Sequence, residues 1–342
     1  MPHSDSQHSD HRQLEPRLGD VRHIHLATDR PLAGAAAFYR AWGLEEVADR
    51  RGGATEHHDD AKRSSQHDDA KRSTLMLRGT GNNHHLVGFV SADHVGLDHI
   101  AFEARSRSEV AALHQRFSSV GVELLGDPAP IDEPGGGWGF RLRDPEGRVL
   151  EVSTEVEAAD PRPRGQSLPT RVTHVVLNTV DIDLMCEFYT EALGFRVSDW
   201  SEHQMVFLRT GHDHHAIAFN VDEHASVNHI AYEVPSLDAF LTSVGRMKRA
   251  GAEPMWGVGR HGPGNNSFAY YGDPVGFVPE FTSEVMQIDE STWVPRVWQR
   301  IPSQSDLWGT AGPPPPEMRA LMKGAPDLNA IAPMWKGTGT YA

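Results

Sequence analysis

This sequence of 342 residues contains an internal duplication. Segments recur in the same order in its two halves: VRHIHLATDR with VTHVVLNTVD, GNNHHLVGF with GHDHHAIAF, LDHIAFEA with VNHIAYEV, and FRLRDPEGRVLEV with AYYGDPVGFVPEF. The interval from His85 to His99 equals the interval from His215 to His229, so the register is preserved there. Such a repeat predicts two modules of the same design.

Each half has the pattern of several strands with one helix after the first strand. In the second half a strand begins at Val172, Asp181 and Asp183 are candidate helix caps, and Gly194 is a candidate helix stop. A doubly wound fold would need helices alternating with strands throughout. An α+β fold is therefore expected in both modules.

Shifts in composition give the expected boundaries. Residues 1–19 are polar and lack periodicity, which predicts a disordered N-terminal tail. The other expected segments are an N-terminal module (20–156) with a charged, solvated insertion (51–73), a Pro-rich linker (157–170), a C-terminal module (171–285) and a Trp- and Pro-rich tail (286–342). The aromatic residues of this last tail indicate that it packs on the body of the protein or over a pocket.

The net charge of the chain limits the classes of molecule that it can bind. It carries 47 acidic and 32 basic residues, a formal net charge of −15, and such a field repels nucleic acids and anionic membranes. No apolar run approaches the roughly 20 residues that span a bilayer, and the N-terminus does not resemble a secretion signal. We therefore expect a cytoplasmic protein with a small ligand. The single cysteine, Cys186, lies in a helical pattern and is assigned no chemistry.

Three residues of the second half form a candidate metal site. His174, His229 and Glu280 lie on three separate strand-like segments, and neighbouring strands can bring such side chains onto one face. A single histidine in a strand is more often a core residue, but the same pattern occurs in both halves. Two imidazoles and one carboxylate form a facial triad that leaves coordination positions for substrate and dioxygen, as in Fe(II) oxygenases.

The segment GRHGPGNNSFAYYGDPVGFVPEF, from Gly259 to Phe281, resembles the C-terminal signature of the two-module type I extradiol ring-cleavage dioxygenases. These enzymes belong to the vicinal oxygen chelate superfamily, and the resemblance extends from about Val21 to Glu284. It implies paired βαβββ units that form a curled, partly open β-barrel around the metal site. It also implies Fe(II), or alternatively Mn(II), held by His174, His229 and Glu280, with O2 as co-substrate, a catechol-type diol as substrate and a homo-oligomeric assembly.

The same resemblance implies three catalytic residues. His215 would be the acid/base histidine, with His261 and Tyr270 beside the substrate oxygens. A catechol must lose protons to chelate a metal through both oxygens, and an imidazole that titrates near neutrality can accept and return a proton. His214 is expected to be only the neighbour of His215, pointing to the opposite face of its strand.

The first half carries equivalents of these residues. His23, His99 and Glu151 stand at the positions of the metal triad, and His85 stands at the position of the acid/base histidine. Asp132 and Arg141 occupy the positions of the pocket histidine and tyrosine if no gap intervenes. We therefore expect a remnant of the duplication, and whether it binds metal stays open.

Substrate contacts are expected from Phe207, Trp256 and Arg260. Trp256 favours a neutral, hydrophobic catechol, whereas Arg260 and Arg296 are compatible with a carboxylated one. Two alternatives to the dioxygenase are a metal-dependent lyase or isomerase of the glyoxalase type and a non-catalytic protein that binds an aromatic ligand.

Overall fold

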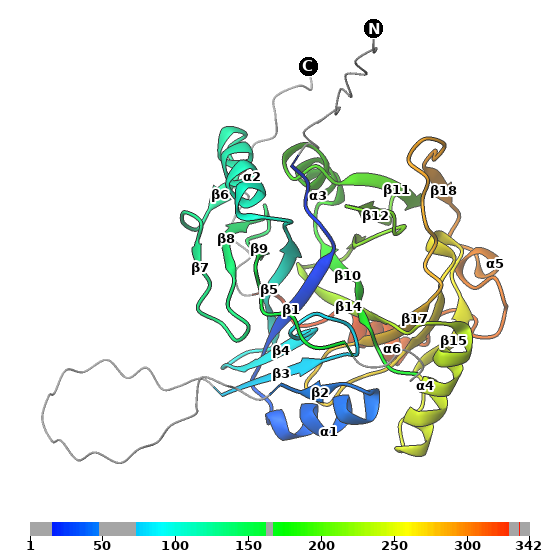
Figure 1. Cartoon of the computed structure of the whole chain (residues 1–342). Helices are drawn as coiled ribbons and strands as arrows, with labels where there is room; N and C mark the ends of the chain where they lie inside the picture. The colour runs from blue at the N-terminus through cyan, green and yellow to red at the C-terminus, as the bar shows by residue number, and fades with distance from the viewer. Residues whose placement is uncertain (1–15, 48–72, 162–166, 328–334, 336–342) are drawn as a thin grey trace, which may run out of the picture.

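The computed structural model describes residues 16–47, 73–161, 167–327 and 335 (Figure 1). Residues 1–15 of the predicted N-terminal tail and all but the last residue of the predicted insertion lie outside this part. The folded body begins before the predicted boundary at residue 20. Leu18 is buried in the core, and the Gly19 N–H donates to the Glu103 carbonyl at 2.8 Å.

Each module contains two copies of a βαβββ pattern. The first comprises β1 (Val21–Thr28), α1 (Leu32–Trp42), β2 (Glu45–Glu46), β3 (Thr74–Arg78), β4 (Val87–Ser91), β5 (Gly96–Glu103), α2 (Arg107–Ser119), β6 (Glu123–Leu124), β7 (Ala129–Pro130), β8 (Trp138–Arg143) and β9 (Val149–Thr154). The second comprises β10 (Arg171–Thr179), α3 (Ile182–Glu187) with a π-helical turn (Phe188–Ala192), β11 (Arg196–Ser201), β12 (Met205–Arg209), β13 (Ile217–Val221), β14 (Ser226–Glu233), α4 (Leu237–Arg249), β15 (Trp256–Arg260), β16 (Ser267–Tyr270) and β17 (Pro279–Ser283).

Each module is built on one mixed sheet of nine strands, and the strand paths match except at the outer strands. The first runs β2-β3-β4-β1-β5-β9-β8-β6, with β7 also paired to β8. The second runs β15-β16-β17-β14-β10-β13-β12-β11-β18, where β18 (Arg296–Trp298) comes from the C-terminal segment. In both, the first strand is parallel to the fourth (β1 with β4, β10 with β13) and antiparallel to the strand that opens the second unit (β5 or β14). Neither path closes on itself within the described strands. The predicted α+β fold of tandem modules is confirmed.

Local signals explain where the helices begin and end. The Asp181 carboxylate accepts a hydrogen bond of 3.0 Å from Leu184 N–H and caps α3, as the sequence predicted. Gly43 ends α1 with a φ of 103°, a left-handed conformation that glycine adopts without steric penalty. The helix pattern derived from the sequence did not locate α2 and α4. Both are capped by a serine, Ser106 or Ser236, whose side chain accepts from the third residue beyond it.

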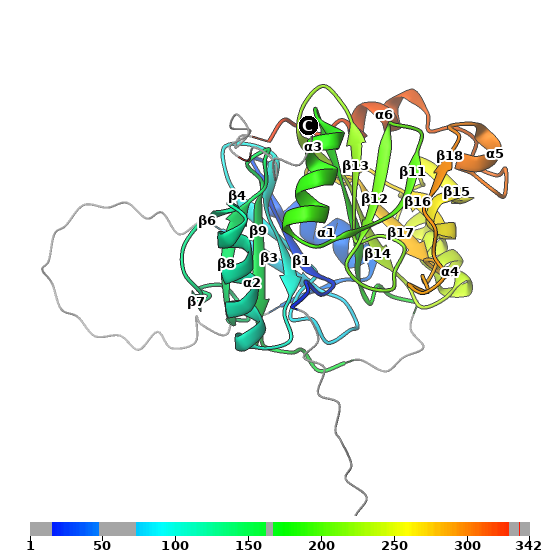
Figure 2. The same ribbon diagram turned by 90° about the horizontal axis from the view of Figure 1, so that it is seen from above.

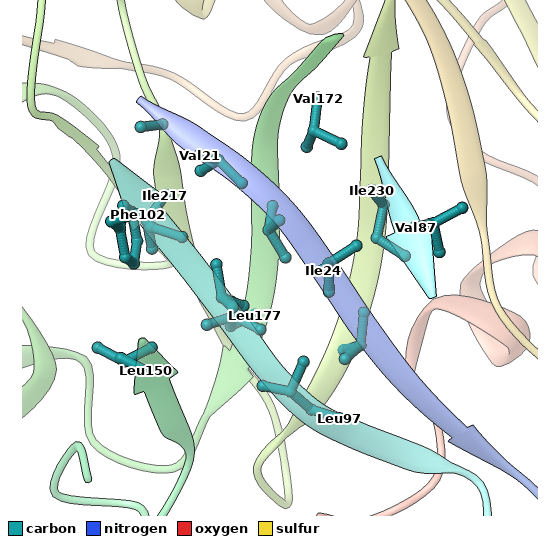
Figure 3. Packing of buried hydrophobic residues seen from close by; sticks show 14 of the residues in the cluster. Val21, Ile24, Val87, Leu97, Phe102, Leu150, Val172, Leu177, Ile217 and Ile230 are labelled. Carbon is teal, nitrogen blue, oxygen red and sulfur yellow. The ribbon is translucent and has the colours of Figure 1, made fainter. Parts of the chain in front are cut away.

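One hydrophobic core spans both modules. Figure 3 shows residues of the first module, such as Ile24 and Leu97, packed in the same cluster as Leu177 and Ile230 of the second. The indole of Trp42 at the end of α1 stacks on the ring of Phe281 in β17, with centroids 3.5 Å apart and planes 6° from parallel. The two modules are therefore one packed unit.

The C-terminal segment covers one edge of the second module (Figure 2). β18 (Arg296–Trp298) pairs parallel with β11, and two short helices follow, α5 (Pro302–Ser305) and α6 (Pro316–Met322). The buried side chain of Met318 in α6 packs in a cluster with Phe268, Tyr270 and Val278. Among the described helices, none combines the length and apolar character needed to cross a membrane.

Candidate metal centre

Three adjacent strands place the candidate metal ligands together. His174 on β10 pairs with Ala231 on β14, and Ala231 pairs with Glu280 on β17. His229 is the second residue before Ala231, so its side chain leaves the same face of the sheet. Glu280 Oε2 lies 3.4 Å from His174 Nε2 and 3.3 Å from His229 Nε2.

The environment of this cluster fits a bound cation. All three side chains are buried, and Glu280 Oε2 has no hydrogen-bond donor. Burial alone would raise the pKa of Glu280, but the imidazoles of His174 and His229 that face it lower this pKa, so the carboxyl is ionised. Burial also lowers the pKa of His229. A divalent metal ion would balance the charge of the carboxylate and give a partner to its orphaned oxygen.

A second layer of polar residues orients the cluster. His229 Nδ1–H donates to Asn228 Oδ1 at 2.7 Å, which leaves the Nε2 lone pair directed at Glu280. The Asn228 amide donates in turn to Asn178 Oδ1 at 2.9 Å. Thr173 Oγ1 lies 3.1 Å from His174 Nδ1. Metal-binding histidines commonly have such partners, which fix the tautomer of the ring.

His215 lies against the cluster, and its outer nitrogen is held by a chain of hydrogen bonds. The centroids of the His174 and His215 rings are 4.0 Å apart. His214 Nε2 lies 3.0 Å from Asp199 Oδ2, and His214 Nδ1 lies 3.0 Å from His215 Nδ1. Donation from His214 to Asp199 makes His214 Nδ1 an acceptor for His215 Nδ1–H, so His215 Nε2 carries a lone pair. Burial lowers the pKa of His215 well below its ordinary value, which keeps the ring neutral.

His214 has a role that the sequence did not predict. It was expected to be only the neighbour of His215, pointing to the opposite face of the strand, but it is fully buried and hydrogen-bonded to both His215 and Asp199. A signal was present, because the HH pair recurs in the first module, where His84 Nδ1 lies 3.0 Å from His85 Nδ1. Asp199 could not have been linked to it from sequence, because their proximity depends on the pairing of β11 with β12.

His261 and Tyr270 form a second pair beside the cluster. His261 Nδ1–H donates to the Ser305 carbonyl at 3.2 Å, and Tyr270 O–H donates to His261 Nε2 at 2.8 Å. The Tyr270 ring stands edge-on to His229, with centroids 5.0 Å apart. Burial lowers the pKa of His261 to about 4 and raises the pKa of Tyr270 well above its ordinary value. Both groups are therefore uncharged at neutral pH.

A cavity of about 530 Å³ adjoins these residues. Its apolar walls include Val176, Met205, Phe207 and Trp256. The C-terminal segment closes much of it, with the side chains of Trp298, Gln299, Arg300, Pro302, Gln304, Ser305, Pro313, Pro314, Arg319, Met322 and Lys323.

Arg260 does not belong to the cavity lining. Its guanidinium pairs with Glu284 at 2.6 Å and lies 5.8 Å from the ring centroid of Trp308. The cations that reach the cavity come instead from the C-terminal segment. Arg300, Arg319 and Lys323 are all exposed residues, which places them at the mouth.

Comparison with known proteins agrees with this architecture. The model of the Glyoxalase/Bleomycin resistance protein/Dioxygenase superfamily matches residues 21–152 and 171–281. The chain belongs to this superfamily. The resemblance to the vicinal oxygen chelate enzymes is thereby confirmed at the level of the superfamily.

Individual proteins of two kinds, dioxygenases and a glyoxalase, are similar to the chain. Metapyrocatechase 2 of Cupriavidus necator is 30% identical over 52% of this chain and 61% of its own length, and a manganese-dependent 2,3-dihydroxybiphenyl 1,2-dioxygenase of Geobacillus genomosp. 3 is 25% identical over 86% of this chain and 94% of its own. An Mn(II)-bound glyoxalase from Novosphingobium aromaticivorans, whose structure has been solved, is 33% identical to this chain. The two structures superpose with a TM-score of 0.76 over 88% of this chain and 94% of the glyoxalase chain.

In the first module, the residues equivalent to the metal triad are not arranged as the sequence predicted. Glu151 Oε2 accepts two hydrogen bonds from Arg141, at 3.1 and 2.9 Å, and lies 4.0 Å from His99 Nε2. Arg141 faces Glu151 across the strands as Tyr270 faces Glu280. His85 turns its Nε2 to His25 at 2.7 Å. The group that converges here consists of His23, His25, His99 and Glu133, with Glu133 in place of Glu151.

Proposed function

We propose that the second module is the active site of a metal-dependent extradiol dioxygenase that cleaves a catechol-type ring next to its hydroxyl groups. His174, His229 and Glu280 would hold Fe(II) or Mn(II). The observation that carries this proposal is the convergence of proton-handling groups around the triad: His215 on one side, and Tyr270 with His261 on the other. The two curated relatives named above, a metapyrocatechase and a dihydroxybiphenyl dioxygenase, support it.

The bound metal would supply coordination positions at which a deprotonated diol and dioxygen can meet. The protein supplies the proton chemistry. His215 Nε2 is an unprotonated acceptor held in one tautomer by His214 and Asp199, so it can take a hydroxyl proton from the diol and return it later. This role suits an imidazole that burial keeps neutral at pH 7.

His261 and Tyr270 would orient the substrate. The Ser305 carbonyl fixes the tautomer of His261, and the neutral Tyr270 hydroxyl can turn from His261 Nε2 towards a substrate oxygen. The apolar walls at Phe207 and Trp256 suit an aromatic ring and exclude water from it. We propose a hydrophobic diol as substrate, with the exposed cations at the mouth available for an acidic substituent.

A glyoxalase-type lyase or isomerase is the second candidate, because the Mn(II)-bound glyoxalase is 33% identical over nearly its whole length. Its chemistry consumes no dioxygen. In that role the pairing of Tyr270 with His261 would have no evident task. A non-catalytic protein that binds an aromatic ligand in the cavity would neither consume dioxygen nor convert the ligand, and its binding would survive removal of metal.

Dioxygen uptake with a panel of catechols distinguishes these candidates. Protein is purified anaerobically and loaded with Fe(II) or Mn(II), and uptake is followed together with the yellow ring-opened product. We expect uptake in the wild type, loss to background in His229→Ala, and retention in His203→Ala, which removes an exposed histidine outside the cavity lining. Fully metal-loaded protein that consumes no dioxygen with any diol would contradict the dioxygenase and favour the lyase or binding protein.

We further propose that the protein acts in the cytoplasm as a homo-oligomer, without nucleic-acid or membrane partners. The net charge of −15 supports the exclusion of polyanionic partners. Size-exclusion chromatography with light scattering would test the assembly state.

A further inference from the structure

We propose that the first module holds a second metal ion, of the Zn²⁺ class, in a four-ligand site formed by His23, His25, His99 and Glu133. One ligand atom from each of these residues lies within 4.8 Å of the others. His99 Nε2 lies 3.3 Å from His23 Nε2, and Glu133 Oε2 lies 3.6 Å from His99 Nε2 and 3.7 Å from His25 Nδ1. Tetrahedral Zn²⁺ with bonds near 2.0–2.1 Å places its ligands about 3.3–3.4 Å apart, so small movements would close the site.

The orientation of His99 matches that of His229 in the second module. His99 Nδ1–H donates to Asp98 Oδ2 at 2.7 Å, just as His229 Nδ1–H donates to Asn228 Oδ1 at 2.7 Å. In each module the side chain that precedes the histidine fixes the tautomer and turns the Nε2 lone pair inward. A carboxylate behind an imidazole is a frequent second-layer partner in zinc sites.

His25 has a hydrogen-bond partner that turns its other nitrogen into the cluster. Its Nε2 lies 2.7 Å from His85 Nε2, and His85 Nδ1 lies 3.0 Å from His84 Nδ1. Donation from His25 to His85 and from His85 to His84 satisfies both contacts with neutral rings. His25 Nδ1 then carries a lone pair on the side of Glu133. His85 therefore orients His25 through this hydrogen bond and is not itself a ligand.

Glu133 presents an oxygen that has no other partner. It lies on the loop between β7 and β8, the counterpart of the loop in the second module that carries His261. One oxygen of Glu133 accepts a hydrogen bond from Arg141, whereas the buried Oε2 has no hydrogen-bond donor. Glu280 Oε2 is orphaned in the same way at the triad. Arg141 also neutralises Glu151, so the cluster of one guanidinium and two carboxylates keeps one negative charge for a cation.

The residues around His25 differ from their equivalents in the second module in a way that makes room for this imidazole. His25 pairs with Gly88, and Gly88 pairs with Met76; the equivalent residues of the second module are Val176, Ala218 and Phe207. A Cβ atom on Gly88 would lie 2.6 Å from His25 Cδ2. The glycine is therefore required by the imidazole. A decaying copy of the triad would not be expected to gain a fourth ligand together with the space for it.

The ligand set indicates the class of metal and its role. Three imidazoles and one carboxylate suit Zn²⁺ and similar first-row ions. Four protein ligands complete a tetrahedral site and leave no position for a substrate, which is the pattern of structural zinc. We infer that this ion stabilises the first module and takes no part in the chemistry of the second.

Metal stoichiometry tests the proposal. Metal-free protein is titrated with Zn²⁺ and with Co²⁺, and the number of metal ions bound per chain is measured by inductively coupled plasma mass spectrometry. We expect two ions per chain in the wild type and one each in Glu133→Gln and in His229→Ala. The double variant His25→Val with Gly88→Ala, which reproduces the Val176 and Ala218 pair of the second module, should also bind one ion and keep its packing.

Two further measurements separate this site from stray binding by other histidines. The titrations are repeated in a variant with serine at the histidines outside the described residues, namely His3, His8, His11, His57, His58 and His67. The strong visible absorption of tetrahedral Co²⁺ should persist in His229→Ala and disappear in Glu133→Gln. A single ion in the serine variant, or two ions retained after the His25 and Gly88 replacements, would overturn the proposal.

Discussion

The Tyr39 hydroxyl on α1 of the first module donates a hydrogen bond of 3.0 Å to Asp273 Oδ2 in the turn before β17 of the second module. The relationship is reciprocal, because the Tyr189 hydroxyl in the π-helical turn after α3 donates at 3.3 Å to Asp144 Oδ2 in the turn before β9. All four groups are buried. The aspartates of the duplicated DP turns therefore join the two modules as well as shaping their own turns.

Tyr39→Phe should lower the free energy of unfolding by about 1.5–3 kcal/mol, since it removes a buried hydrogen bond to a charged group. Tyr189→Phe should cost less, because Asp144 keeps its ion pair with Arg148 at 3.3 Å. Equilibrium denaturation by urea measures both. Equal losses in the two variants would contradict the argument that Arg148 compensates.

The effect of Tyr39→Phe should depend on pH. Burial raises the pKa of Asp273 to about 6, and the Tyr39 hydroxyl partly opposes this rise. When the pKa of a carboxyl is higher in the folded state than in the unfolded state, the group stabilises the folded state most at a pH below its unfolded pKa, here 3.8. This stabilisation is lost as the pH rises through the folded pKa of about 6. The variant raises the pKa further, so its cost should be larger at pH 8 than at pH 5. A cost that is the same at both pH values would show that Asp273 is not the responsible group.

The repeat in the sequence predicted most of the fold and the candidate triad, because strand geometry converts sequence spacing into position. His174, His229 and Glu280 leave one face of adjacent strands, so their meeting follows from alternation and register. The helices α2 and α4 were not located. Their serine caps were visible in sequence, but the apolar pattern of α2 is weak between its polar residues.

The first-module site could not be derived in this way. Homologous spacing selected Glu151, but Arg141 occupies the position of Tyr270 and binds that carboxylate. Glu133 reaches the cluster from a loop, where the path of the backbone sets its position and strand register does not. His25 is present in sequence, but its role depends on the space beside Gly88.

Asp199→Asn should change the acid/base behaviour of His215. The asparagine amide can present a donor to His214 Nε2, and the tautomers of His214 and His215 would then reverse and remove the lone pair from His215 Nε2. We expect kcat to fall about 10²-fold or more, with a displaced pH profile. Steady-state dioxygen uptake across pH measures both.

Trp298→Phe is the matched control for that variant. It removes the other hydrogen bond to Asp199 Oδ2, of 2.7 Å, and leaves the acceptor for His214 in place. Its pH profile should be unchanged even if kcat falls slightly. An unaltered pH profile in Asp199→Asn would show that the chain of hydrogen bonds does not set the protonation of His215.

Asn228→Ala should weaken metal binding in the second module about 10- to 100-fold, because His229 loses the acceptor that fixes its tautomer. Competition with a chelator, measured on protein in which the first-module ligand Glu133 is replaced by Gln, reports on this site alone. Thr173→Ala, which removes the weaker contact of 3.1 Å to His174, should have a smaller effect. A larger loss of metal affinity in Thr173→Ala than in Asn228→Ala would contradict the argument that the hydrogen bond from His229 to Asn228 is the more important of the two.

Arg148→Met should lower the free energy of unfolding by about 3–5 kcal/mol, because it leaves buried carboxylates without their cation. The fully buried guanidinium pairs with Asp144, Glu146 and Asp327 and also donates to the Asn178 carbonyl of the second module. Asp327→Asn removes only the charge contributed by the C-terminal segment, so its cost should be smaller than that of Arg148→Met. Thermal or urea denaturation gives the ranking. A milder effect of Arg148→Met than of Asp327→Asn would show that the apolar surroundings, and not this ion cluster, hold the C-terminal segment and both modules together.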